Sequence, residues 1–379
     1  MNNLYDTCLK QLLDLFPELA SKISLQNIRK NSKQLNYNLA EDATVDHSLI
    51  FNIKNNKKLF SNRKVLFAHF SPYKYELEGW GLPLYASKCL EDSVIHMSYQ
   101  KGLNRPKLFE INDLKSKKID KFLEYYDVII ARSSVLNNMK RDNVLGKIVD
   151  NSKYVVNIKT MSHKPNYGNA DHYFEEEEMC PMAGPVFKKS CNSFLKSYPK
   201  KNIILIPGTI WYVKNQLKFF EQIDSHLIKD YTVVLAGENK DIPSGYFQKI
   251  IDICKNKKIN PAFIGNVSEE FLINLYCLSK ICAIPMDPRP YGSPKGYPRV
   301  LGESIEGKCI TLCNKATTVP EFFSDTLLVY DHEVQNSLNK IMKEAKSIVS
   351  KENYIKDHNW GKITFEEQCE QILKKCFIK

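Results

Sequence analysis

The chain has 379 residues, of which 43% are apolar and 26% charged, and its formal net charge is +11. This is a globular composition, and its length is too great for one ordinary hydrophobic core, so we expect two domains. No apolar run approaches about 18 residues, which excludes a membrane-spanning helix. Because the basic charge is dispersed, it favours anionic partners such as nucleotide phosphates, nucleic acid or a membrane surface, unless it only reflects a lysine-rich proteome.

The eleven cysteines are irregularly spaced, and none of them forms a Cys-x-x-Cys pair. The nearest two along the chain are Cys309 and Cys313, in a segment with a strand pattern. An odd count at irregular spacing indicates reduced thiols and argues against a disulfide framework or a zinc site. The first residues carry no apolar signal core. We therefore expect a cytoplasmic protein, and peripheral attachment to the cytoplasmic face of a membrane stays open.

The first half of the chain opens with a polar, lysine-rich stretch. Apolar side chains recur near helical spacing from Leu4 to Leu19 and predict an amphipathic helix, while residues 31–58 are loop-like. Short apolar runs then predict buried strands at 65–69, 94–98, 127–131 and 153–158. Helical patterns lie between some of them, at 82–90 and 113–125. Such alternation is typical of a parallel sheet whose two faces are covered by helices.

The alternation breaks at residues 162–201, where prolines, glycines and the run Glu175–Glu178 predict a loop followed by a basic linker. It then resumes. Strands are predicted at 203–206, 232–236, 261–264, 281–284 and 309–312. Helical patterns are found at 215–223, 246–255, 269–279, 299–306 and from about 334 onward.

These patterns predict an α/β fold of two doubly wound, Rossmann-like parallel-sheet domains that face each other across a cleft. In such sheets ligands bind at the carboxyl ends of the strands. The predicted divisions are a helical and loop-like extension, two Rossmann-like domains and a last helix that packs back on the first domain, at 1–62, 63–195, 196–355 and 356–379.

Several segments of the second half match a known signature in the right order. They are Ile204–Gln216, Val233–Glu238, Phe263–Tyr276, Lys295–Glu303, Thr317–Glu321 and the pair Asn359-Trp360. Together these segments resemble the retaining GT-B glycosyltransferases of family 4, over roughly residues 200–372. The resemblance implies a GT-B architecture in which the domain at 63–195 binds the acceptor and the domain at 196–355 binds a nucleotide sugar.

The segment Lys295-Gly-Tyr-Pro-Arg-Val-Leu-Gly-Glu303 also has the physical properties of a diphosphate site. A helix that starts near Pro298 directs free N–H groups and a positive dipole end toward a ligand, and Gly296 lets the backbone approach it closely. Cations are available to neutralise phosphate oxygens, namely Lys214, Lys295 and Arg299. In the family the Glu that matches Glu303 accepts hydrogen bonds from ribose hydroxyls. An ordinary α/β turn with solvated cations is the alternative.

The chain departs from the family at Lys295, where the signature has a Glu that contacts the hydroxyls of the donor sugar. A charged Lys accepts no hydrogen bond. Either the sugar is held differently, or Lys295 binds phosphate, or catalysis is impaired. The family commonly has an Arg at the position of Thr209, and its absence favours the phosphate role for Lys295, with Arg289 as another replacement.

The candidate site residues follow from this resemblance and from the predicted strand ends. The proposed catalytic residues are His163, Lys214 and Lys295. The donor would contact Gly79, Gly81, Thr209, Lys214, Glu238, Asn266, Val267, Lys295, Gly296, Tyr297, Pro298, Arg299, Val300 and Glu303. The acceptor would meet Arg132 and Ser133. His163 has an alternative as an ordinary loop histidine, and the two glycines before it have one as a plain strand–helix turn.

We therefore expect a glycosyltransferase that moves a sugar from a UDP- or GDP-sugar to a glycan, lipid-linked or protein-linked acceptor, with retention at the anomeric carbon. Fixed cations and helix N–H groups stabilise the leaving diphosphate, so we expect neither a metal nor a cofactor. A non-catalytic nucleotide-sugar or glycan-binding module is the main alternative, because of Lys295. A nucleic-acid binder is suggested by charge alone, and the scattered basic residues argue against it.

Overall fold

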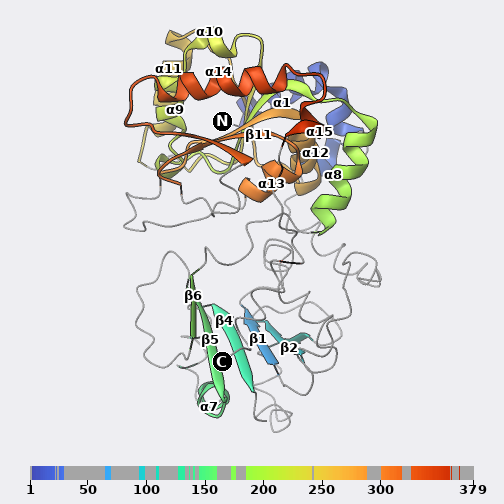
Figure 1. Ribbon diagram of the computed structural model, residues 1–379, viewed down its shortest axis with the longest axis vertical. Coiled ribbons are helices and arrows are strands. Elements are labelled where there is room, and N and C mark those ends of the chain that lie inside the picture. Colours follow the sequence, from blue (N-terminus) through green and yellow to red (C-terminus); the bar gives the residue numbers. More distant parts are fainter. Residues whose placement is uncertain are drawn as a thin grey trace. The chain divides into compact units, whose positions relative to one another are not determined.

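The structure is a computed structural model. It describes residues 2–21, 23, 25–29, 65–69, 94–98, 108–110, 127–132, 136, 140, 145–159, 172–175, 185–240, 243–287, 300–317, 326–358, 360 and 367. The chain divides into two compact units, Met1–Leu35 with Val186–Lys362 and Asn36–Pro185 with Ile363–Lys379, and each is described by itself (Figure 1). Within the described residues, no helix is long and apolar enough to cross a membrane.

The unit Asn36–Pro185 contains a six-stranded parallel sheet in the order β3-β2-β1-β4-β5-β6. Its strands are β1 (Val65–His69), β2 (Val94–Ser98), β3 (Leu108–Glu110), β4 (Val128–Arg132), β5 (Tyr154–Lys159) and β6 (His172–Glu175). The four strands predicted here are confirmed as β1, β2, β4 and β5. The two edge strands were not predicted, and β6 corrects the expected loop. Both are too short to show an apolar period, and edge strands tolerate polar residues.

The unit Met1–Leu35 with Val186–Lys362 contains a second six-stranded parallel sheet, in the order β12-β11-β10-β7-β8-β9. Its strands are β7 (Lys201–Pro207), β8 (Thr232–Ala236), β9 (Ala262–Gly265), β10 (Ser279–Ile284), β11 (Ile310–Asn314) and β12 (Leu327–Tyr330). The five predicted strands are confirmed, and only the edge strand β12 was missed. Numbered from its first strand, each sheet has the order 3-2-1-4-5-6 of a doubly wound Rossmann fold, as predicted.

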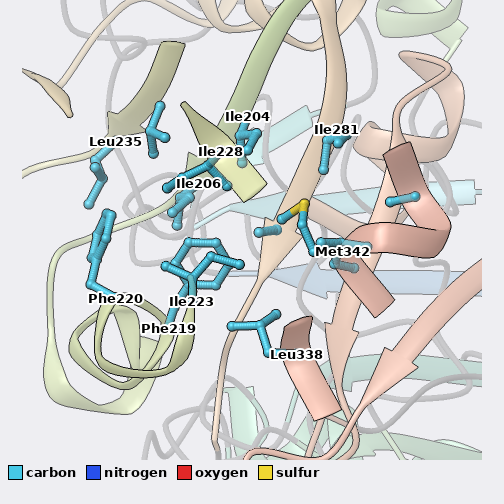
Figure 2. Packing of buried hydrophobic residues seen from close by; sticks show 14 of the residues in the cluster. Ile204, Ile206, Phe219, Phe220, Ile223, Ile228, Leu235, Ile281, Leu338 and Met342 are labelled. Carbon is cyan, nitrogen blue, oxygen red and sulfur yellow. The ribbon is translucent and has the colours of Figure 1, made fainter. Parts of the chain in front are cut away.

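Helices α9 (Gln216–Gln222), α11 (Tyr246–Asn256) and α14 (Ser337–Val349) bury their apolar sides against alternate residues of the second sheet. Figure 2 shows Phe219 and Phe220 of α9 beside strand residues such as Ile204, with Leu338 and Met342 of α14 close by. All of these side chains are buried. Helices α12 (Glu269–Leu278) and α13 (Val300–Glu306) contact β10, with α12 also against β7 and α13 against β11. The central strands are therefore apolar on both sides, as their sequences indicate.

Helix α8 (Pro185–Ser197) occupies the segment where the sequence predicts a basic linker, and that prediction is wrong. Its lysines are on the outside, whereas Phe187, Cys191 and Phe194 recur at spacings of four and three and are buried. Pro185 stands at the start, where its missing N–H costs no hydrogen bond. Because the segment is rich in Lys and Ser, its apolar stripe of three residues was not recognised in the sequence.

Helices α8 and α12 are joined by a disulfide between Cys191 and Cys277, whose Cα atoms are 5.8 Å apart. The expectation that the thiols are reduced is therefore wrong for this pair. The two cysteines are separated by 86 residues along the chain, so spacing gives no sign of the pairing, which depends on how the helices pack. Five other described cysteines are free and buried: Cys8, Cys254, Cys282, Cys309 and Cys313.

The N-terminal segment consists of α1 (Asn2–Leu15), the 3₁₀ turn η1 (Pro17–Ala20) and α2 (Leu25–Ile28). The predicted amphipathic helix is thus confirmed, and it ends in a tighter turn. In this segment α1 packs against the edge strand β9 of the second sheet, and η1 packs against α12 (Figure 1). Leu12, Leu19 and Ile28 are buried, and the Asn274 side chain of α12 donates to the Leu19 carbonyl over 3.0 Å. The segment therefore completes the unit formed by the second half of the chain.

Candidate functional site

In the second sheet the order of the strands reverses between β7 and β10, which are neighbours in the sheet although two strands separate them in the sequence. Crevices that bind ligands in doubly wound folds form at such a switch point, beyond the carboxyl ends of the strands. In the described chain, the turns at residues 208–214 and 285–287 follow β7 and β10, which flank this switch point. The turns at 237–240 and 266–268 follow β8 and β9 at the same edge of the sheet.

The turns after β7 and β8 are in direct backbone contact. The Gly208 N–H donates to the Ala236 carbonyl over 2.7 Å, and the Ile210 N–H donates to the Glu238 carbonyl over 2.8 Å. A Cβ added to Gly237 would lie only 2.2 Å from the Gly208 oxygen. The absence of a side chain at Gly237 is therefore what lets the two turns approach each other.

Lys214 ends the short 3₁₀ turn η8 (Tyr212–Lys214) that follows β7. Its Nζ lies 3.4 Å from Met286 Sδ at the end of β10, and its Cε lies 3.9 Å from where a Cβ on Gly208 would be. The ammonium group is thus held between the ends of the two strands that flank the switch point. An ammonium group at this position has the charge that an anionic ligand at the switch point would require.

The end of β10 is anchored by neighbours on both sides. The Asp287 N–H donates to the Val213 carbonyl over 2.9 Å, which links this turn to the one that carries Lys214. The Met286 carbonyl accepts from the buried side chains of Asn314 (3.2 Å) and Thr317 (2.9 Å). These bonds fix Met286, and through it the position of the Lys214 side chain.

Asp287 also lies beside a histidine that the sequence analysis did not single out. Its carboxylate is 3.4 Å from Nε2 of His332, which follows β12, and both side chains are less than 15% exposed. The Gln222 side chain of α9 donates to the His332 carbonyl. Nothing in the sequence indicates this pair, because 45 residues and two strands separate its members.

Glu238 and Asn266 form a second polar group, at the ends of β8 and β9. The Glu238 N–H donates to Asn266 Oδ1 over 3.0 Å, and Asn266 Nδ2 donates to Glu238 Oε2 over 3.1 Å. Both residues are exposed. The pair presents a carboxylate and an amide to solvent, a set that suits an uncharged ligand group with hydrogen-bond donors and acceptors.

Glu303 lies on α13 and is half-buried. Its Oε2 accepts a hydrogen bond from the Tyr276 hydroxyl over 2.8 Å. Burial, and then the Glu303 charge, raise the pKa of the Tyr276 phenol well above its usual value, so the phenol stays protonated and donates. Tyr276 therefore orients the carboxylate that the sequence assigns to ribose binding, and this role was not visible in the sequence.

The structure brings together many of the predicted donor-site residues in the second unit. Thr209, Lys214, Glu238, Asn266 and Val267 lie in the turns after β7, β8 and β9, and Val300 and Glu303 lie on α13. The Thr209 carbonyl accepts from the buried Gln216 side chain over 2.9 Å. Arg132 ends β4 in the other unit.

The remaining predictions fall outside the described residues. These are Gly79, Gly81, Ser133, His163, Arg289, Lys295, Gly296, Tyr297, Pro298 and Arg299. The described residues contain no group of His, Cys, Asp and Glu side chains that could hold a metal ion, and metal-free chemistry stays a prediction.

No family model and no curated protein matches the chain. Solved structures do match, although their sequences differ widely from this one. HepE of Anabaena, solved in complex with UDP, is 12% identical, with 83% of this chain and 95% of that chain covered and a TM-score of 0.51. A glycosyltransferase of Rickettsia africae is 14% identical, with 84% and 95% covered and a TM-score of 0.52.

A trehalose 6-phosphate synthase of Burkholderia multivorans has a TM-score of 0.54 at 7% identity, with 83% of this chain and 96% of that chain covered. Matches that span nearly the whole length of each neighbour, at this identity, show the fold and nothing finer. The chain has the GT-B fold, with two Rossmann-like parallel sheets.

Proposed function

We propose that the protein is a glycosyltransferase that takes a sugar from a nucleoside-diphosphate sugar, UDP- or GDP-linked, and transfers it to a glycan, lipid-linked or protein-linked acceptor. The observation that carries this proposal is the position of Lys214. Its ammonium lies at the switch point of the second sheet, against Met286 and above Gly208, where a diphosphate is expected to bind. The solved neighbour HepE, which shares the fold, contains UDP.

The order of groups along the sheet supports a nucleotide. The Lys214 cation follows β7. Glu238 and Asn266, the pair that suits an uncharged ligand group, follow the next two strands, β8 and β9. The cation lies between the ends of β7 and β10, and the polar pair lies at the ends of β8 and β9, so the two groups follow neighbouring strands at one edge of the sheet. This order suits a diphosphate at the cation and a nucleobase at the polar pair, with Glu303 proposed for the ribose hydroxyls.

In the proposed mechanism the bond between the anomeric carbon and the diphosphate breaks, and negative charge grows on the leaving phosphate. The Lys214 ammonium stabilises this charge electrostatically. The resemblance to family 4 supports retention of configuration and positioning of the reacting sugar by His163. The absence of an Arg at Thr209 favours phosphate binding by Lys295, and Arg299 is a further cation for the phosphate oxygens. Lys295 favours a second candidate, a module that binds nucleotide sugar without transferring it, because the family has a Glu at that position.

Binding of UDP and GDP tests the proposal, measured as the rise in melting temperature of the whole chain. A ligand that binds only the folded state stabilises it by about 2.7 kcal/mol at a hundredfold excess over Kd. We expect one of the two nucleotides to raise the melting temperature, and Lys214→Met to abolish the rise. The matched control is Lys218→Met on α9, whose Nζ contacts Glu221 at 3.5 Å, and which should leave the rise intact.

The absence of any nucleotide response would contradict the proposal, as would equal responses in the two variants. Incubation of the wild-type chain with UDP- and GDP-sugars, followed by mass spectrometry of acceptors and released sugar, separates the two candidates. Transfer or slow hydrolysis supports the enzyme, whereas tight nucleotide binding without either supports the non-catalytic module.

A further inference from the structure

The N-terminal segment contacts the two turns that carry Glu238 and Asn266. It is formed by α1, η1 and α2 together with Arg29, and we call it the N-terminal brace. A doubly wound fold does not need such a segment, since the sheet and its own helices already form the core. Besides its packing on α12, the brace makes a group of polar and ring contacts at the carboxyl end of β9.

Arg29 is the principal contact. Its guanidinium donates to two main-chain carbonyls of the β9 end, that of Ile264 and that of Asn266, the latter over 3.1 Å. Asp6 of α1 lies 2.9 Å from the same guanidinium and holds it in place. Because the planar guanidinium has donors in a fixed arrangement, it fixes the direction of the backbone from Ile264 to Asn266.

The main chain extends this support. The N–H of Ser268, the last residue of the turn, donates to the Ile28 carbonyl over 2.7 Å. Ser268 in turn caps α12 by accepting from the Phe271 N–H. The turn that carries Asn266 is thus held from the brace on both sides, by Arg29 before it and by Ile28 after it.

Tyr5 of α1 supports the same turn and its neighbour. Its ring lies against Gly265, so that a Cβ on that glycine would be 2.9 Å from Tyr5 Cδ2. Gly265 has a φ of +64°, and its carbonyl accepts from the Gly237 N–H over 2.9 Å. A shift of Tyr5 therefore reaches the β8 turn through Gly265 and Gly237. Burial raises the pKa of the Tyr5 phenol, and the nearby Glu238 carboxylate contributes to the rise.

We propose that Arg29 and Tyr5 are positioning residues for the nucleobase of the donor, acting through the turns that carry Asn266 and Glu238. This inference rests on the proposed function, since it takes the bound molecule to be a nucleoside diphosphate. The brace contacts the base end of the site, whereas the Lys214 end depends on Met286, Asn314 and Thr317. Changes in the brace should therefore alter how the base is selected and leave the binding of phosphate unchanged.

The test compares three probes, UDP, GDP and inorganic pyrophosphate, by calorimetric titration of the whole chain. In Arg29→Met we expect the affinity for the preferred nucleotide to fall about tenfold, which is a loss of about 1.4 kcal/mol, and the ratio of the UDP and GDP affinities to move toward one. Pyrophosphate should bind as before. Arg29→Lys should restore part of the discrimination, since a lysine keeps the charge but reaches fewer carbonyls at once.

Two further variants keep the test decisive. Tyr5→Leu retains apolar bulk, removes the ring from Gly265, and should shift the UDP-to-GDP ratio in the same direction as Arg29→Met. Glu18→Gln is the matched control. It lies in the same brace, pairs with Lys201 at 3.0 Å at the amino end of β7, and should leave all three affinities unchanged.

The outcomes separate the two proposals. If the wild-type chain binds neither UDP nor GDP, the proposed function fails and the inference fails with it. If the wild-type chain binds one of them, but the brace variants lower nucleotide and pyrophosphate affinity together, or change neither, the inference alone is overturned. A general loss of stability would lower all affinities without moving the UDP-to-GDP ratio.

Discussion

Gly237 lies where the turns after β7 and β8 touch. Its Cβ position is 2.2 Å from Gly208 O and 2.8 Å from Thr209 N, both of them main-chain atoms that cannot move aside alone. We expect Gly237→Ala to destabilise the protein by about 1–3 kcal/mol through overpacking and to weaken nucleotide binding, because it separates the Lys214 turn from the Glu238 turn. Urea unfolding followed by circular dichroism measures the first effect and the melting-temperature rise with UDP or GDP the second.

Gly245→Ala is the control for backbone conformation. Gly245 has a φ of +80°, but a Cβ there would meet no atom within 4 Å. It should cost only the strain of a left-handed alanine, about 1–2 kcal/mol, with nucleotide binding unchanged. A variant Gly237→Ala that binds nucleotide as well as Gly245→Ala does would show that the two turns need not touch.

Glu303 shows how far single residues can be predicted. Its place on a helix beside the candidate site follows from the motif Lys295–Glu303, and the structure does place it on α13. Its hydrogen bond with Tyr276 does not follow. In the sequence Tyr276 lies among apolar residues of a helical segment, as core residues generally do. Only the packing of α12 on α13 brings the two side chains together. A partner contributed by another element leaves no local pattern.

At the scale of elements, Lys200 lies in the link between α8 and β7 and connects three other elements of the second unit. Its ammonium donates to the carbonyls of Tyr276 (3.1 Å), Ser279 (2.6 Å) and Gly307. Tyr276 lies in the last turn of α12, Ser279 begins β10 and Gly307 follows α13. Burial of Nζ lowers the pKa of Lys200 to about 8 because desolvation penalises the charge, and the nearby Lys308 charge also lowers it. The link is therefore sensitive to pH.

The sign of that sensitivity follows from the two states. The pKa of Lys200 is about 8 in the folded chain and near its ordinary 10.5 in the unfolded chain. Between these values the unfolded state binds more protons, so the contribution of Lys200 to stability rises with pH and is constant below about pH 8. We expect the free energy of unfolding of the wild type, minus that of Lys200→Met, to grow by on the order of 1–3 kcal/mol between pH 7.5 and 10.5.

Urea titrations of both proteins at several pH values measure this difference. Comparison with the variant cancels the titration of groups that do not contact Lys200, while the neighbouring thiols Cys282 and Cys309 need a parallel series in Cys309→Ser. A difference that stays constant over the whole pH range would mean that Lys200 remains charged in the folded protein.

The strands were predictable from the sequence where both of their faces are buried. All nine predicted strands occur, because a strand buried on both faces is a continuous apolar run bounded by turn residues. The missed elements include the short edge strands β3, β6 and β12 and the helix α8, which carry mixed sequences. The short helices α7 (Leu145–Asp150) and α10 (Ser225–Ile228) were also missed. The Cys191–Cys277 disulfide was missed for another reason, since it depends on contact between two helices distant in sequence.

At the scale of the whole molecule, the order of the strands and helices was enough to predict two Rossmann-like sheets, since alternating strands and helices permit few other arrangements. The location of residues 1–29 was not predictable. An amphipathic helix shows that one of its faces is buried, but its sequence does not say against what. In the structure the chain begins on the second sheet, then forms the first, and returns to complete the second.

Because the N-terminal brace lies on the second sheet, we can predict the effect of removing it. The brace buries Leu12, Leu19 and Ile28 almost completely, and each is worth about 1.5–3 kcal/mol. Their sum is comparable with the whole stability of an ordinary domain, about 5–15 kcal/mol, and their loss would expose the β9 end and α12 to solvent. We expect a chain without residues 2–29 to be largely insoluble or to melt far below the full chain, as judged by circular dichroism and light scattering.

The same truncation tests whether the brace acts as a separable element. A synthetic peptide of residues 2–29, added to the truncated chain during refolding, should restore solubility and nucleotide binding, because all the contacts with β9 and α12 are non-covalent. A peptide carrying Arg29→Met and Tyr5→Leu should restore solubility less well and should not restore discrimination between UDP and GDP. A truncated chain that is soluble and selects its nucleotide without any peptide would show that the second sheet positions Asn266 and Glu238 unaided.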